Sequence, residues 1–236
     1  MKLLSRIRDS YGALHILYRI SGLINLFCRR FDRERNRAQR SRAELPAGRL
    51  NGQDTGALAQ LPLGAWRMGC NGCEVIAAYN ALLSLGRGRP LTEVADALER
   101  GGLMFNGFGG TNLGAVTAYF RRCGVFVRVL RRRERAQFDA AFAQTDCAVL
   151  SYWTGPTLRR SDGSWNTLHT VSVHHTPTGV ELCNVHSRST APELAESIGA
   201  FLQKEDGDPV CLLLLLGEKA VDKVRGKRYN NRRTTR

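Results

Sequence analysis

Residues 71–86, NGCEVIAAYNALLSLG, decide the fold class of this 236-residue chain. From Cys73 to Leu85 the run is rich in helix formers, and its apolar side chains recur at helical spacing. Gly86 supplies a stop signal. The stretch therefore predicts a central helix that begins at Cys73.

Further helices and then strands are predicted on the C-terminal side of this central helix. Apolar periodicity predicts helices at residues 93–100, capped by Thr92, and at residues 113–123, 137–143 and 192–203. Apolar and β-branched runs predict strands at residues 125–130, 147–153, 167–174, 180–186 and 210–216. The order of helices first and a mainly antiparallel sheet afterwards predicts an α+β fold.

The basic charge of the chain is confined to its two ends. The formal net charge is +14. Residues 1–42 carry 11 basic and 3 acidic side chains and residues 218–236 carry 8 and 2, which leaves 16 of each sign on residues 43–217. A neutral middle argues against a basic groove, so we expect no specific nucleic-acid partner. Binding of anionic lipid or nucleic acid by the tails stays open, and strong salt dependence that disappears with both tails would reveal it.

Composition divides the chain into four predicted parts: a basic helical extension (1–45), a linker (46–65), a catalytic-sized domain (66–217) and a basic tail (218–236). Within the extension, residues 14–28 have the period of an amphipathic helix but are too short and polar to span a membrane. Contact with an anionic membrane surface and ordinary packing on the protein are equal alternatives. Because no secretion signal precedes the cysteines, we predict a cytoplasmic protein, either free or peripheral at the membrane.

The seven cysteines are an odd number, which argues against a disulfide framework. Cys147, Cys183 and Cys211 lie in apolar strand-like runs and are predicted to be buried. Cys70 and Cys73 form a C-x-x-C pair, which also suits a redox dithiol or half of a zinc site. No second such pair exists, and no strand leads into it. We therefore expect neither a metal nor another cofactor.

Cys73 is the candidate nucleophile because it stands where a glycine-containing loop meets the predicted central helix. The unpaired N–H groups and the dipole of a helix N-terminus stabilise a nearby thiolate. The same N–H groups can stabilise the oxyanion that forms when a thiolate attacks a carbonyl. This position therefore meets both needs of covalent catalysis.

A nucleophilic cysteine also needs a base and a group that orients the base. His169 and Asn184 are the candidates, since they lie on the two strands joined by the turn sequence Thr-Pro-Thr-Gly. With a turn centred near residue 177, positions 169 and 184 are predicted to lie almost opposite each other.

Three other histidines compete with His169 for the role of base. Alternation along the strand places His174 on the face opposite to His169, so it is predicted to point away from the site. His175 shares the face of His169 but falls at the turn. His186 is predicted to be a surface residue at a strand end.

The segments NGCEVIAAYNALLSLG, LHTVSVHH and VELCNVHS together resemble the papain-like cysteine peptidases of bacteria, especially relatives of the double-glycine leader (bacteriocin-processing) peptidases. The resemblance covers about residues 66–216. Residues 110–112, Gly-Thr-Asn, add a similarity to uncharacterised bacterial Asn-Gly-Cys proteins. The resemblance implies a papain-like fold in which Cys73 is the nucleophile, His169 the base and Asn184 the residue that orients it.

The sequence departs from this family pattern on both sides of the cysteine. The family usually has a glutamine about six residues before the nucleophile, where this chain has Arg67. Asn71 is the nearest side-chain amide and is the candidate oxyanion donor. Glu74 replaces the usual small residue after the cysteine, and its carboxylate would oppose thiolate formation unless it points away.

A substrate cleft is predicted around the glycine-rich residues 101–112 and around the end of the strand at residues 147–153. Asn112 and Trp153 are its candidate lining residues, although an interhelical loop and a loop anchor are equally common roles for such positions.

We therefore expect a cysteine hydrolase, peptidase-like, that cleaves a peptide or amide bond of a peptide or protein substrate through a thioester on Cys73. An acyltransferase would use the same residues. The alternative from another class is a catalytically weak papain-like fold that binds a peptide or a partner protein.

Overall fold

The computed structural model describes residues 29–45, 47–107, 110–155 and 167–217. It confirms the α+β prediction, because helices pack on a six-stranded antiparallel sheet in the order β3-β8-β4-β5-β6-β7. The strands are β3 (Phe126–Arg131), β4 (Cys147–Trp153), β5 (Leu168–Thr176), β6 (Gly179–Cys183), β7 (Glu193–Ala195) and β8 (Asp208–Leu216), with a separate pair β1 (Pro62–Leu63) and β2 (Trp66–Arg67). The helices are α3 (Arg29–Arg40), α4 (Gly56–Gln60), α5 (Met68–Asn71), α6 (Cys73–Ser84), α7 (Leu91–Gly101), α8 (Leu113–Arg122), α9 (Phe138–Phe142) and α10 (Ile198–Lys204), with 3₁₀ turns at Phe105–Gly107 and Arg132–Gln137.

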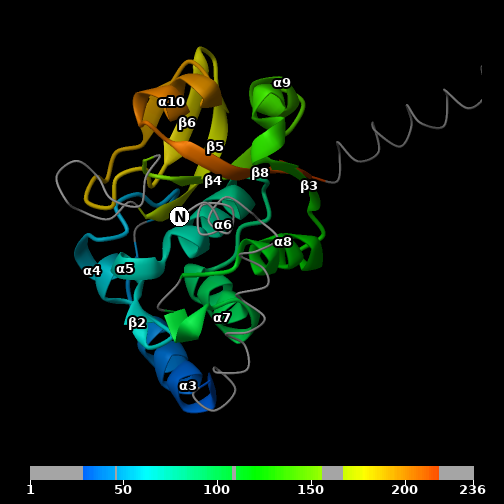
Figure 1. The fold of residues 1–236 in the computed structure, drawn as a ribbon. Helices are drawn as coiled ribbons and strands as arrows, with labels where there is room; N and C mark the ends of the chain where they lie inside the picture. The colour runs from blue at the N-terminus through cyan, green and yellow to red at the C-terminus, as the bar shows by residue number, and fades with distance from the viewer. Residues whose placement is uncertain (1–28, 46, 108–109, 156–166, 218–236) are drawn as a thin grey trace, which may run out of the picture.

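Helices cover both faces of the sheet. Figure 1 shows α6, α7 and α8 on one side of the strands, and α9 and α10 on the other. The α6 face is marked by Cys147 of β4, whose thiol donates to the carbonyl of Ala81 (3.7 Å). On the opposite face, Tyr152 of β4 packs edge-on against Phe201 of α10. The apolar core is therefore split into two layers by the sheet.

Helix α6 is the central helix that the sequence predicts. It begins at Cys73 and is buried almost all round, as expected for a helix enclosed between a sheet and other helices. It ends at Ser84, and Gly86 follows with a φ of 66°, a left-handed conformation that favours glycine. The first residue of this helix is thereby fixed at the edge of the core.

Strands β5 and β6 form the predicted hairpin, but their register differs from the expected one. Ser172 pairs with Cys183, and β6 ends there. Asn184 follows with a φ of 67°, which turns the chain out of the strand. The prediction that positions 169 and 184 lie opposite each other in the ladder is wrong, because the turn is centred half a residue later and the strand stops short.

Two other predictions about elements need correction. The predicted helix at residues 192–203 is in fact strand β7 followed by α10, which starts after Ser197 because the Ser197 hydroxyl accepts from the Ala200 N–H (3.0 Å). Helix α7 begins at Leu91 after Pro90, so Thr92 lies inside the helix and does not cap it.

The segment predicted as a linker is packed into the fold wherever it is described. Leu50, Leu58, Leu61 and Leu63 are buried in the core beneath α6 and α7. The polar, glycine-rich composition predicted a linker, yet its leucines supply enough apolar surface to hold the segment in place.

Helix α3 is tied to α7 by a buried polar cluster. Arg40, 1% exposed, donates to the Glu99 carboxylate (2.6 Å) and to the Pro62 carbonyl (2.8 Å). The same carboxylate accepts from the Asn36 side chain (2.6 Å) and from the Gly64 N–H (2.8 Å). The end of the predicted extension is therefore part of the folded unit.

Within the residues that the structure describes, no helix is both long and apolar enough to cross a membrane. The predicted amphipathic helix at residues 14–28 and the basic tail lie outside the described residues.

Candidate functional site

Cys73 lies at the N-terminus of α6, where the first N–H groups of the helix have no partner within the helix. The side chain is 6% exposed. The backbone N–H of Thr170, on strand β5, also reaches its sulfur. The position predicted for the nucleophile is thus occupied by a buried thiol set among backbone donors.

The thiol of Cys73 contacts Glu74. Its Sγ–H donates to Oε2 of Glu74 at 3.3 Å. Burial raises the pKa of the Cys73 thiol well above its ordinary value, the charge of Glu74 and this hydrogen bond raise it further, and the Thr170 N–H acts in the opposite direction. At neutral pH the thiol therefore keeps its proton.

Glu74 is itself buried, with 2% of the residue exposed. Burial raises the pKa of its carboxyl group to about 7, against the effect of hydrogen bonds from its own N–H, from Cys73 and from the Thr111 N–H. Gly110 passes so close that a Cβ there would lie 3.4 Å from both carboxylate oxygens. The carboxyl group is therefore near its titration midpoint at neutral pH.

His169 does not meet the thiol. Alternation along β5 puts it on the face of Tyr152, against which its ring packs edge-on at 6.0 Å, whereas α6 covers the other face. Its Nε2–H donates to the backbone carbonyl of Asn184 at 2.6 Å, and among the described residues no hydrogen bond joins the ring to Sγ of Cys73. Burial lowers the pKa of His169, so the ring is neutral at pH 7 and Nδ1 is its acceptor nitrogen.

Asn184 contacts His169 through its backbone and not through its side chain. The side-chain amide of Asn184 faces Gln53 instead, accepting from the Gln53 N–H (3.0 Å) and donating to Oε1 of Gln53 (2.9 Å). The Asn184 N–H donates in turn to the side chain of Asn51 (2.7 Å). The predicted orienting residue does fix the imidazole, but by its carbonyl oxygen.

Gln53 and Asn51 are the site-forming residues that sequence reasoning missed. Both lie in the predicted linker, more than 130 residues from Asn184. Gln53 is 5% exposed, and its amide also donates to the Gly69 carbonyl (3.1 Å) on α5. A polar residue in a glycine-rich segment gives no signal of such a distant contact.

The three weaker site predictions fall on structural contacts. Asn71 donates its amide to the Gly107 carbonyl (2.6 Å), so it is not turned to the thiol as an oxyanion donor. Asn112 caps α8 by accepting from the Ala115 N–H (3.1 Å) and directly follows Thr111, which borders Glu74. Trp153 ends β4 and packs against the core on the α6 side.

The competing histidines lie elsewhere. His174 lies on the face opposite to His169, as predicted, and this is the face that α6 covers. Its partner there is Ser84 (3.0 Å), roughly 16 Å along the helix from Cys73. His175 stacks on Phe142 and hydrogen-bonds the Thr145 carbonyl. His186 is 54% exposed.

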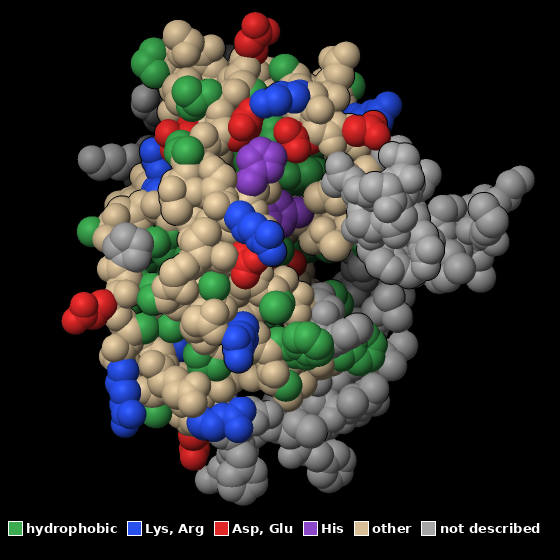
Figure 2. Space-filling model, turned by 90° about the vertical axis from the view of Figure 1, so that its left-hand side faces the viewer, with side chains coloured by type: hydrophobic (Ala, Val, Ile, Leu, Met, Phe, Trp, Pro, Cys, Tyr) green, Lys and Arg blue, Asp and Glu red, His purple; other side chains and the backbone are tan. Residues whose placement is uncertain are grey.

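Figure 2 shows the side of the molecule that carries α4 and α5, where histidine, acidic and basic side chains gather near the middle.

His174 makes the fold sensitive to acid. Burial, then the charges of Arg49 and His175, lower its pKa to about 3 from 6.5. Above pH 6.5 the ring is neutral in both the folded and the unfolded chain, so it costs the fold nothing. As the pH falls from 6.5 towards 3, the fold loses stability, because the unfolded chain binds the proton more readily. We expect the free energy of unfolding to fall by about 2–3 kcal/mol more in the wild type than in His174→Gln between pH 7 and pH 4. Urea titrations at each pH measure the free energy of unfolding, and the same dependence of that free energy on pH in both proteins would refute the prediction. His186→Gln, which replaces an exposed histidine, is the control.

The cysteines form no described metal or disulfide site. Cys70 is exposed and Cys73 buried, and both are free thiols. In the described part of the chain, no group of three His, Cys, Asp or Glu side chains is placed to hold a metal ion.

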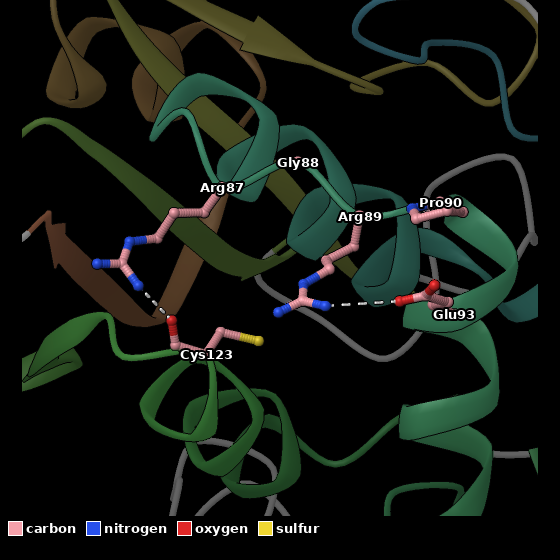
Figure 3. Close-up of a pocket in the computed structure, with 6 residues that line it drawn as sticks. All are labelled: Arg87, Gly88, Arg89, Pro90, Glu93 and Cys123. Atoms are coloured by element: carbon pink, nitrogen blue, oxygen red, sulfur yellow. Dashed lines mark hydrogen bonds and ion pairs between the residues drawn. The ribbon is translucent and has the colours of Figure 1, made fainter.

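A separate cavity of about 350 Å³ lies at the far end of α6, lined by Arg87, Gly88, Arg89, Pro90, Glu93 and Cys123 (Figure 3). Its arginines are engaged locally, since Arg87 donates to the Cys123 carbonyl (2.6 Å) and Arg89 lies 3.8 Å from Glu93. None of the predicted site residues lines it.

The chain was compared with protein-family models, with curated proteins and with solved structures, and none of them matches it. Functional inference therefore depends on the residues around Cys73.

Proposed function

We propose that this protein is a cysteine hydrolase with a papain-like fold, in which Cys73 attacks a peptide or related amide bond. The observation that carries the proposal is the position of Cys73: its sulfur lies at the N-terminus of the central helix and against the N–H of Thr170, the residue that follows His169 on β5. The order of a cysteine-led helix followed by histidine and asparagine on a hairpin, with its resemblance to bacterial papain-like peptidases, supports the same function.

In this proposal the Cys73 sulfur forms a bond to the substrate carbonyl carbon as the thiol loses its proton. The leaving nitrogen takes up a proton when the C–N bond breaks, which leaves a thioester. The oxygen of a water molecule then bonds to the thioester carbon while Nδ1 of neutral His169 takes a proton from that water. The C–S bond breaks, and the proton passes from His169 to the sulfur, which restores the thiol and the neutral ring. Backbone N–H groups of the first turn of α6 and of Thr170 take the role of oxyanion donors in place of Asn71.

A second function is favoured by one specific observation. The thiol and the imidazole are both neutral and hydrogen-bond to other groups, Glu74 and the Asn184 carbonyl. A papain-like module that binds a peptide or a partner protein and catalyses no reaction would show the same two neutral groups with the same hydrogen bonds.

Acylation separates the two functions. Treated with p-nitrophenyl acetate, a hydrolase should form acetyl-Cys73 and release it, whereas exposed Cys70 should react only as an ordinary thiol. We expect His169→Ala to slow the release by about a hundredfold or more, since a positioned base contributes that much, and Cys73→Ala to abolish it. Mass spectrometry locates the acetyl group, and released nitrophenolate gives the rate.

His175→Ala is the matched control, because it removes an exposed histidine of the same strand, whose ring contacts Phe142 and the Thr145 carbonyl. It should leave the rate unchanged. Two results together would refute the hydrolase proposal and favour the binding module: acetylation of Cys73 no faster than that of Cys70, and equal rates of nitrophenolate release in all variants.

A further inference from the structure

Glu74 is a buried carboxylate that has no cationic partner among the residues that the structure describes. The groups that hydrogen-bond to it are its own N–H, the Thr111 N–H and the Cys73 thiol, all of them uncharged. None of the ion pairs formed by described residues includes it. Acidic side chains are almost never fully buried unless they are paired. Above neutral pH the site therefore carries a negative charge that no cationic side chain of the described residues offsets.

A second acceptor lies beside this carboxylate. Thr111 is 1% exposed, and its Oγ1 has no hydrogen-bond partner among the described residues, although its N–H meets Glu74. Gly110 has a φ of 75° and brings the backbone against the carboxylate oxygens. A hydroxyl oxygen and a carboxylate oxygen together can accept from the several N–H donors of an ammonium group.

Occupation of this acceptor pair would act directly on Cys73. Oε2 of Glu74 holds the thiol hydrogen at 3.3 Å, so a cation that binds this carboxylate would lie close to the thiol and could draw on that oxygen. A bound cation offsets the carboxylate charge and competes for that oxygen, so it removes both effects of Glu74 on the thiol.

We propose that Glu74 and Thr111 recognise a protonated amine that the substrate carries close to its scissile carbonyl, and that binding of this amine frees the Cys73 thiol for attack. The proposal rests on the proposed hydrolase function and specifies its substrate class as cationic peptides or amides. Without such a substrate, Glu74 keeps the nucleophile protonated.

Charged thiol reagents test this recognition. Methanethiosulfonates form a disulfide with a thiolate and release methanesulfinate, and they exist with an aminoethyl (cationic) or a sulfonatoethyl (anionic) group. The quantity to measure is the cationic-to-anionic rate ratio at Cys73 divided by the same ratio at Cys70, which cancels intrinsic reactivity. We expect a value of at least about ten in the wild type at ~pH 8, and a fall to within about twofold of one in Glu74→Gln.

A pH series on the wild type provides a second measurement that needs no variant. Protonation of Glu74 should remove the preference at ~pH 5.5, because the pKa of this carboxyl group is about 7. Two other titratable groups lie near the thiol. Burial raises the pKa of Tyr152, so this phenol keeps its proton over the whole range. Burial lowers the pKa of His169, which favours the neutral ring.

An equal preference in the wild type and Glu74→Gln, or one that does not change with pH, would overturn this inference and leave the hydrolase proposal intact. Failure of the hydrolase proposal has a different signature, which is a Cys73 that accepts no acetyl group from p-nitrophenyl acetate.

Discussion

Glu99→Ala is expected to lower the free energy of unfolding by about 3–5 kcal/mol, because it leaves the buried Arg40 guanidinium without its main counter-charge. The carboxylate also accepts from Asn36 and from the Gly64 N–H, so the Gly64 N–H loses its acceptor and the Asn36 amide keeps only the Gly64 carbonyl (2.7 Å). Asp96 offers little replacement at 3.9 Å from Arg40. Urea unfolding followed by circular dichroism measures the effect.

Glu93→Ala is the matched control on the same helix. Glu93 is 58% exposed and lies 3.8 Å from Arg89, and exposed pairs of this kind contribute only about 0–1 kcal/mol. A loss of less than about 1 kcal/mol in Glu99→Ala would mean that the cluster does not hold α3 in place.

Glu74→Gln is expected to make Cys73 at least about tenfold more reactive towards iodoacetamide at ~pH 8, since each unit of pKa decrease gives ten times more thiolate. The substitution removes the like charge beside the sulfur, while burial still holds the pKa of Cys73 above its ordinary value. Below ~pH 6 the two proteins should converge, because the wild-type Glu74 is then uncharged. Mass spectrometry with Cys70 as the internal standard gives the rates.

Glu181→Gln provides a close comparison, because Glu181 accepts a hydrogen bond from another buried cysteine, Cys183 (3.4 Å). It should leave the labelling of Cys73 unchanged. If Glu74→Gln labels Cys73 no faster than the wild type does at ~pH 8, Glu74 is not what keeps the thiol protonated.

The elements that the sequence predicted well are those with local causes. Helix α6 and strand β4 each carry their signal in one continuous run, and the hairpin is specified by the turn residues between β5 and β6. The strand β7 was missed because three residues without alternation give no strand signal, and only the ladder to β6 defines it.

The sequence identified residues of the candidate site but did not predict which of them contact each other. Alternation separates the two faces of β5, yet it cannot say which face a helix will cover, and His169 lies on the face that α6 does not cover. The partner of the Asn184 side chain is Gln53, which only the tertiary fold brings near. Glu74 was recognised as a departure from the family pattern, but its direct contact with the thiol depends on a rotamer that sequence does not fix.

Strand β8 also constrains the order in which the protein can assemble. It is the last strand that the structure describes, yet it lies between β3 and β4 and pairs with both. While the ribosome is still adding residues 208–216, β3 and β4 have exposed edges and the apolar layers on both faces remain open. The sheet can therefore close only after residues 208–216 have been made, and until then the exposed edges and apolar layers are open to aggregation or to binding by a chaperone.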